Sequence, residues 1–324
     1  MMNRKKLLSS TLFVSAAAVF CTMLWGSAFP CIKIGYRLFG IDGSDIPSTL
    51  VFAGARFAAA GLIVLIIGLI ISPQKMKLGK KDILPISLLG LFQTFMQYLL
   101  LYIGLVNVSG TKSSVLTSVS AFASVILSAL FFKNDSLTVK KLLGCAIGIA
   151  GIIVMNAGGD MGGFILIGDG LVILSNLSGA AGNIVTKKIS GGRSPLQISA
   201  WQFIFGGSAL IIAGSVLGGR LVFHEYGCIL ILLYLAAMAG IAFLIWTMLI
   251  SHNSVSRIAV FNLLIPVFGT MWSGIFLGEN VLTASNILSL LLVCSGIFLV
   301  NFRSIRKGSV EHVGTDKQND NGYD

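Results

Sequence analysis

The chain has 324 residues, of which 55% are hydrophobic and only 11% are charged, and its mean hydropathy is +0.91. This composition excludes a soluble globular domain, which carries about 25% charged residues, and it also excludes a disordered chain. The net charge of +11 would suggest a nucleic-acid partner in a soluble protein, but here the basic residues lie mostly in short gaps between apolar runs, so we expect none. A polytopic membrane protein remains.

The apolar runs predict membrane spans, because a spanning helix needs about 20 apolar residues. The first run follows a basic start like that of a signal peptide, but it is long and further runs follow, so we interpret it as a span. The polar residues 303–324 are expected to form a disordered cytoplasmic tail. The ten predicted spans are 11–36, 48–71, 83–106, 113–132, 142–157, 164–186, 196–218, 227–250, 258–277 and 282–302.

The distribution of Lys and Arg predicts the orientation. Eighteen of the 23 basic residues lie before the first span, in every second gap or after the last span, and the other gaps hold only Arg37, Lys112 and Arg220. Cytoplasmic loops carry the excess of positive charge. The bias therefore places both termini in the cytoplasm, which requires an even number of spans, in a multi-pass protein of the cell (inner) membrane.

The chain contains an internal repeat. Shifting residues 113–156 by 145 positions superposes them on residues 258–301 without a gap, so that Phe131 meets Phe276 and Asn156 meets Asn301. Five spans precede the middle of the chain and five follow it, so the second half must enter the membrane from the opposite side. Such inverted repeats are typical of alternating-access carriers. The predicted fold is an all-α integral membrane protein of ten helices in two inverted five-helix repeats, at 1–157 and 164–302, followed by the tail at 303–324.

Several short motifs resemble those of the EamA-like branch of the drug/metabolite transporter superfamily, in order and spacing along residues 11–302. They are Trp25-Gly26-Ser27-Ala28-Phe29 with Lys33, Ala55-Arg56-Phe57, Ile265-Pro266-Val267-Phe268 and Phe276-Leu277-Gly278-Glu279. The resemblance implies a carrier that exports a small metabolite such as an amino acid. The first repeat departs from the pattern at Ala121, where the second has Pro266, and Gly179 stands where such proteins often carry Trp.

Catalytic and metal-binding motifs are missing from the sequence. The three His residues lie in predicted gaps or in the tail, and the five Cys are scattered through the spans without metal-ligand spacing. No zinc-protease, nucleophile-elbow or phosphate-loop motif occurs. We therefore expect a protein that is not an enzyme and that has no cofactor and no metal.

Two basic residues lie inside predicted spans, where a bare charge is costly. Arg56 in the second span either binds an anionic group of a substrate or makes a structural tie to backbone carbonyls, while Lys33 lies near the end of the first span and either snorkels or faces a cavity. No Asp or Glu lies in the middle of a span. A proton-coupled exporter of cations would use such a carboxylate, so this pattern favours zwitterions or organic anions over cationic drugs.

Uncharged polar and aromatic residues within the spans outline a possible pathway. Gln93, Gln97 and Tyr98 share one face of the third span, with Tyr102 a turn beyond. Each polar residue could instead be interhelical glue, and each Trp an interface anchor. The predicted substrate-binding set is Trp25, Lys33, Arg56, Gln93, Gln97, Tyr98, Tyr102, Asn176, Asn183, Gln202, Asn262 and Trp272.

The predicted function is alternating-access efflux of a small-molecule substrate, an amino acid or organic anion, across the lipid bilayer. The alternatives are export of drugs or other cationic compounds, or uptake. A Gly144-x-x-x-Gly148 motif predicts close helix packing, either within the bundle or between the protomers of a homodimer.

Overall fold

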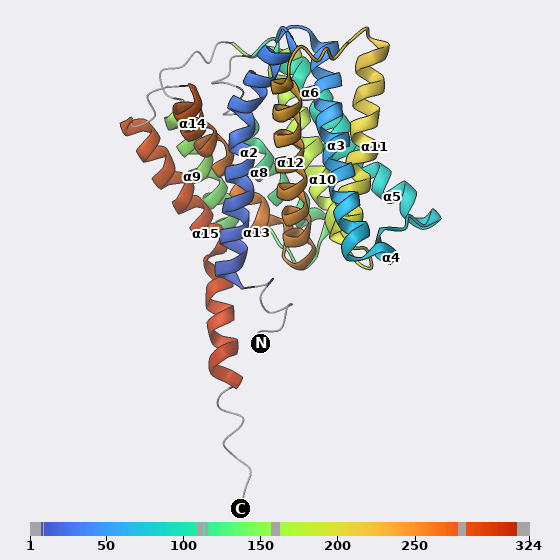
Figure 1. Cartoon of the computed structure of the whole chain (residues 1–324). Coiled ribbons are helices and arrows are strands. Elements are labelled where there is room, and N and C mark those ends of the chain that lie inside the picture. The colour runs from blue at the N-terminus through green and yellow to red at the C-terminus, as the bar shows by residue number, and fades with distance from the viewer. Residues whose placement is uncertain are drawn as a thin grey trace, which may run out of the picture.

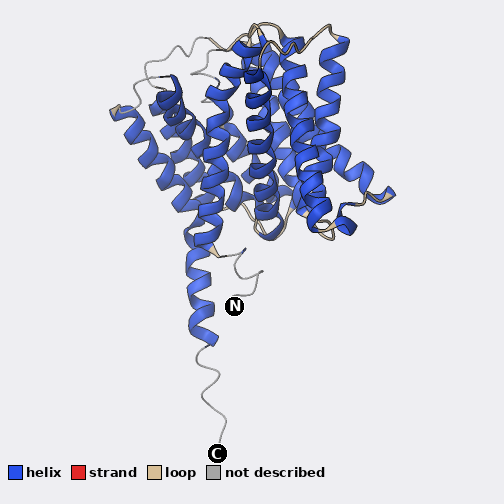
Figure 2. Ribbon diagram, in the orientation of Figure 1, coloured by secondary structure: helices blue, strands red, loops and turns tan. Residues whose placement is uncertain are grey.

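The computed structural model of the chain describes residues 8, 10–108, 113, 116–156, 163–277 and 283–315, with the side chains of the last helix described to residue 301. Within these ranges every regular element is a helix (Figure 2). Most of the helices run side by side in one bundle, and α2 begins at the same end of the bundle from which α15 emerges (Figure 1). We refer to this end, which also holds the α8–α9 and α12–α13 connections, as the lower end.

The first half of the chain forms helices close to the first five predicted spans. A π-helical segment, η1, joins α5 to α6, so the three form one continuous helix. The elements are α2 (Thr11–Phe39), α3 (Ile46–Ile71), α4 (Pro73–Met76), α5 (Lys80–Gly90), η1 (Leu91–Met96), α6 (Gln97–Leu105), α8 (Val119–Phe131) and α9 (Val139–Met155).

The second half follows the same order of long helices. A π-helical turn, η2, precedes its first helix, and a 3-10 segment, η3, interrupts its fourth. The elements are η2 (Leu166–Gly170), α10 (Leu171–Ile189), α11 (Pro195–Val216), α12 (Tyr226–His252), α13 (Val255–Ala259), η3 (Val260–Leu263), α14 (Leu264–Leu277) and α15 (Ala284–Thr315).

Seven helical segments of the described chain are long and apolar enough to cross a membrane, and α8 is a shorter apolar helix. The chain is therefore a multi-pass membrane protein. Three of the ten predicted spans correspond to helices whose described residues are too few or too polar to cross a membrane on their own. Helices α8 and α9 have 13 and 17 residues. Helix α10 has 19 residues but carries the polar residues Ser175, Asn176 and Asn183 in its interior.

Local chemistry explains several helix ends. The Asp45 carboxylate accepts the Ser48 N–H at the start of α3, and the Thr138 hydroxyl accepts the Lys141 N–H at the start of α9. Such N-caps satisfy donors that a helix start leaves unpaired. Helix α2 ends at Gly40, whose φ of 64° is a left-handed conformation that glycine adopts at little cost.

The C-terminal boundary differs from the prediction. Helix α15 continues through Thr315, whereas the sequence predicts a disordered tail from residue 303. No proline interrupts the segment, so the helix can continue past its apolar part. The cytoplasmic location of the tail stays a prediction. The rest of the tail, 316–324, lies outside the described residues.

The two halves of the chain pack against each other through glycine-lined crossings. Helix α3 packs along α11, where a Cβ on Gly207 would lie 2.5 Å from the Ala58 backbone nitrogen. Helix α9 packs along α15, where a Cβ on Gly144 would lie 2.7 Å from the Gly296 carbonyl oxygen. The Gly144-x-x-x-Gly148 motif is thus used inside the bundle, one of the two alternatives that the sequence left open.

Candidate functional site

Asn183, on α10, is the centre of a buried polar cluster. Its side-chain oxygen accepts hydrogen bonds from Gln93 Nε2 and from Trp246 Nε1, each at 3.2 Å, and its Nδ2 donates to Ser124 Oγ at 3.4 Å. Gln93 comes from η1, Trp246 from α12 and Ser124 from α8, so the cluster joins both halves of the chain. We call these four residues the Asn183 cluster.

The π-helical segment brings this part of the third predicted span close to α10. Gln93 and Thr94 lie within η1, and both are buried. Two glycines on α10 make room, since a Cβ on Gly182 would lie 2.6 Å from Gln93 Cβ and one on Gly179 would lie 2.7 Å from Gln97 Oε1. Gly179 therefore provides the space that Gln97 occupies.

A continuous series of aromatic rings leads away from the Asn183 cluster. Trp246 contacts Trp25 edge to face, and Trp25 contacts Phe243 in the same way, with ring centroids 4.9 Å apart in both pairs. The series then continues through Phe203 to Phe57, with centroid distances of 5.0 and 5.3 Å. Such contacts hold the rings in fixed orientations, and they come from α2, α3, α11 and α12.

Arg56 lies at the far end of this series. The residue is only 3% exposed, and its guanidinium carbon lies 4.4 Å from the centroid of the Phe57 ring and 5.5 Å from that of Tyr98. Its Nε is buried without a hydrogen-bond partner. No carboxylate in the described part of the chain pairs with this charge. The aromatic faces favour the cation electrostatically, and the Tyr98 side chain makes a hydrogen bond with it, but neither supplies the negative charge of an anion.

Further buried polar atoms near the same helices have no partner in the protein. A buried polar atom normally makes a hydrogen bond, so a group of unpaired ones indicates a place where water or a ligand supplies the partner. Five of these atoms are on residues that belong to the predicted pathway or adjoin it in sequence: Trp25 Nε1, Thr94 Oγ1, Gln202 Nε2 and Oε1, and Asn262 Oδ1. Two others, Ser289 Oγ and Asn301 Oδ1, are on α15 and do not belong to it.

Four further residues of the predicted set have the following contacts and positions. Asn176 Nδ2 donates to the Val172 carbonyl within its own helix, at 2.8 Å, and Trp272 Nε1 donates to the Met23 carbonyl of α2, at 3.0 Å. Tyr102 is buried with its ring centroid 6.2 Å from that of Tyr98. Lys33 is exposed on α2.

The aromatic residues Phe57, Phe203 and Phe243 did not belong to the predicted set, although they connect Arg56 to Trp25. Phe57 follows Arg56 in the motif that carried the resemblance, so the sequence held a signal for that residue alone. The other two look like any apolar residue of a span. No group of three or more His, Cys, Asp or Glu side chains in the described ranges could hold a metal ion.

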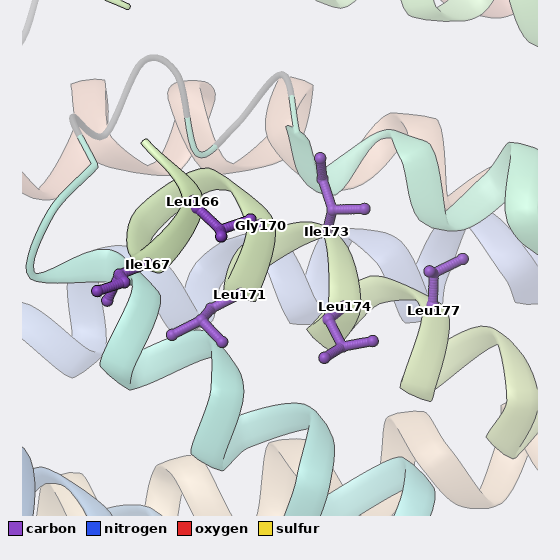
Figure 3. A pocket seen from close by; sticks show the side chains of 7 residues that line it. All are labelled: Leu166, Ile167, Gly170, Leu171, Ile173, Leu174 and Leu177. Atoms are coloured by element: carbon purple, nitrogen blue, oxygen red, sulfur yellow. The ribbon is translucent and has the colours of Figure 1, made fainter. Parts of the chain in front are cut away.

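A separate hollow of about 390 Å³ lies on the surface of η2 and α10 (Figure 3). Only apolar residues line it, Leu166, Ile167, Gly170, Leu171, Ile173, Leu174 and Leu177. Apolar surface of this kind on a membrane helix suits lipid chains, and it offers no polar group to orient a metabolite. The hollow is therefore distinct from the polar interior.

The bundle of membrane helices with unpaired polar groups inside it defines a membrane transport protein rather than a soluble binding module. Comparison with known families agrees, because the model of the EamA-like transporter family matches residues 12–157 and again residues 166–302. The chain belongs to the EamA-like transporter family. This confirms the family suggested by the motifs of the first, second and ninth predicted spans.

Curated relatives cover nearly the whole chain. It is 28% identical over 295 residues to the "Uncharacterized transporter YvbV" of Bacillus subtilis (strain 168), covering 88% of this chain and 90% of that protein. It is 27% identical over 313 residues to a "Probable amino-acid metabolite efflux pump" of Escherichia coli (strain K12), covering 92% and 97%. A solved crystal structure shares the fold, with a TM-score of 0.75 at 16% identity, over 92% of this chain and 99% of the other.

Proposed function

We propose that the protein is an alternating-access carrier that exports a small zwitterionic or anionic metabolite, such as an amino acid, across the cell membrane. Arg56 is the observation that carries this proposal. A buried guanidinium without a carboxylate partner is costly unless another anion pairs with it. A substrate carboxylate, bound by two parallel N–H groups of the guanidinium, supplies that anion.

The aromatic series and the unpaired amides supply the other parts of a substrate site. Rings from α2, α3, α11 and α12 offer apolar surface next to Arg56, and Gln202 holds both a donor and an acceptor that lack partners. Binding sites for small molecules combine apolar walls with a few such polar groups. Lys33, Gln97, Tyr98 and Asn262 remain candidates for further contacts to the substrate.

The carrier architecture that we propose has ten membrane helices in two inverted halves, with both termini in the cytoplasm. The family model matches twice, once in each half, which supports the repeat. The lower end then faces the cytoplasm, in agreement with the basic residues Arg193, in the α10–α11 connection, and Arg257, in α13. The relatives named as amino-acid metabolite efflux pumps support both the substrate class and the direction. A homodimer is compatible with this arrangement and is not needed by it.

Exchange in proteoliposomes tests the proposal. Vesicles that contain purified protein are loaded with unlabelled amino acids and organic anions, and uptake of labelled members of the same pool is measured. We expect exchange that is lost in Arg56→Ala. Arg220→Ala is a matched control, because Arg220 is an exposed cation outside the long helices. Exchange of cationic drugs without exchange of amino acids or organic anions would contradict the proposal and favour the multidrug alternative.

A further inference from the structure

Asp135, in the connection between α8 and α9, is a buried carboxylate with partners from both halves of the chain. The residue is 5% exposed. Its oxygens accept hydrogen bonds from Lys141 Nζ at 2.5 Å and from the Ser128 hydroxyl, both in the first half. They also accept the Ser256 N–H at 3.0 Å and the Ser256 hydroxyl, in the second half. Removing a carboxylate from water is costly, and these hydrogen bonds offset that cost while the charge is buried.

Ser256 lies in α13, where the fourth long helix of the second half begins. Asp135 therefore takes an N–H group that a helix start leaves unpaired. The surroundings are fully packed, since Val255, Ser256 and Ile258 are all 0% exposed. In the described part of the chain α8 packs most extensively against α10, and within the fourth long helix of the second half it packs against α13 and η3 rather than along α14. The contact between α8 and the long helix that begins with α13 is thus concentrated at the lower end.

The partner side of this contact is itself held in place. Lys187 Nζ, from α10, donates to the carbonyl oxygens of Ile250, Ser251 and Asn253 at 2.9, 3.1 and 2.8 Å. Asn253 Nδ2 in turn donates to the Leu8 carbonyl at 3.0 Å. The α12–α13 connection is therefore fixed to α10 and to Leu8, three residues before α2 begins, so Ser256 is presented to Asp135 in a defined position.

Another ion pair at this end also joins the halves but has different surroundings. Arg193 Nε donates to Asp82 Oδ1 at 2.8 Å, and the side chains are 18% and 22% exposed. Asp82 lies in the first turn of α5, which packs along α11, so breaking this pair would leave those helices in contact. The Asp82–Arg193 pair provides a matched control, with the same charge type at the same end but away from the α8–α13 contact.

We propose that Asp135 holds the lower end of the carrier closed, and that the release of Ser256 from Asp135 opens the path to the cytoplasm. We call the contact between Asp135 and Ser256 the Asp135 clasp. The proposal rests on the alternating-access function. When the clasp opens, Asp135 keeps Lys141 and Ser128 as partners and loses only the two groups of Ser256. The carboxylate is thus never left without a partner, which makes the opening reversible.

Distances between two spin labels at the lower end test the clasp without any substrate. The labels are placed on Ser136→Cys and His252→Cys, which are exposed positions on either side of the contact, with the exposed Cys294 changed to Ser. Electron–electron distance measurements in lipid nanodiscs then report opening. In Asp135→Asn we expect the population at longer distance to rise about fivefold or more, because the amide has one acceptor oxygen and loses the ion pair with Lys141. Asp82→Asn should keep the parental distribution.

Ser256→Ala provides the second variant, since it keeps the carboxylate and its ion pair and removes one bond across the contact. We expect about a twofold rise in the long-distance population for this variant. Parental distances in both Asp135→Asn and Ser256→Ala, with parental melting temperatures, would overturn the proposal. If Asp135→Asn does not fold, Ser256→Ala decides alone. Absence of exchange for every substrate, with the expected distance changes, would refute the substrate assignment and leave the clasp standing.

Discussion

The surroundings of Arg56 and of Asp135 differ in how completely they satisfy a buried charge. Asp135 is held by four hydrogen bonds from protein groups, while Arg56 rests on two aromatic rings and keeps an unpaired Nε. A charge whose partners are all in the protein stabilises one arrangement of the chain. A charge that has no anionic partner in the protein supports the proposal that a molecule from outside supplies one. If both proposals hold, Asp135 stabilises a conformation and Arg56 binds substrate.

The largest expected effect is on transport in Arg56→Gln. This change removes the charge but keeps a polar side chain of similar reach, so we expect exchange of anionic or zwitterionic substrates to fall about 100-fold, the equivalent of one or two hydrogen bonds to a charged group. Thermal unfolding should shift little, because no protein anion loses a partner. Exchange assays and melting curves on the same preparation measure both effects. A large loss of stability with normal exchange would show that Arg56 is structural.

Two buried amides should respond in opposite ways to replacement by Leu. Asn183→Leu leaves Gln93, Trp246 and Ser124 without their partner, and we expect a loss of stability of about 2–4 kcal/mol. Gln202→Leu removes two atoms that have no partner, so stability should stay the same or rise while exchange falls. Chemical or thermal unfolding in detergent measures the difference. Equal destabilisation by the two changes would remove the distinction between paired and unpaired groups.

A smaller effect is expected from a single methyl group on α10. In Gly179→Ala the new Cβ would lie 2.7 Å from Gln97 Oε1, the far end of a flexible side chain that must move aside. We expect the concentration for half-maximal exchange to rise about threefold to tenfold with little change in stability, if Gln97 contacts substrate. Gly43→Ala is the control, because nothing lies within 4 Å of a Cβ there. Unchanged exchange in Gly179→Ala would remove Gln97 from the site.

The smallest expected effect is that of pH on the Asp135 clasp. Burial raises the pKa of the Asp135 carboxyl, but the hydrogen bonds from Lys141, Ser128 and Ser256 outweigh it and hold that pKa below its ordinary value. Because the pKa is lowered, the charged carboxylate stabilises the closed clasp fully at any pH above the ordinary pKa of Asp. This stabilisation is lost only when the pH falls through the lowered pKa. Two cationic side chains interact with this carboxylate: Lys141 pairs with it, and Lys187 acts on it electrostatically.

The spin-label distance at the lower end should therefore stay constant between about pH 5 and pH 8, and should lengthen only below about pH 4. Measurement of the same label pair across this range checks the expectation. A change of distance centred near pH 6 or 7 would mean that another group controls the opening.

Much of the fold could be predicted because it depends on local patterns. Apolar runs located the helices, and the motif at Arg56 identified the family together with a residue that proves to be buried. The hydrogen-bond partners of buried polar residues could not be predicted. Asp135 and Ser256, for example, are 121 positions apart in the sequence, and Asp135 lies in a predicted gap between spans. The helical periodicity also predicted Gln93 and Tyr98 on one face of the helix. The π-helical segment η1 has more residues per turn than an α-helix, so the two side chains point in different directions. Gln93 contacts α10, while Tyr98 contacts Phe57 of α3.

Helix α10, which brings Asn183 to the polar cluster, is poorly suited to enter a membrane alone. It carries two asparagines and ends in two lysines. A segment of this kind partitions poorly into lipid unless other helices are already present. We therefore expect α10 to insert against helices made before it. In a truncated chain that ends after α10, this helix should span the membrane only when α2, α3 and α5–α6 precede it, so the polar interior also sets the order of biogenesis.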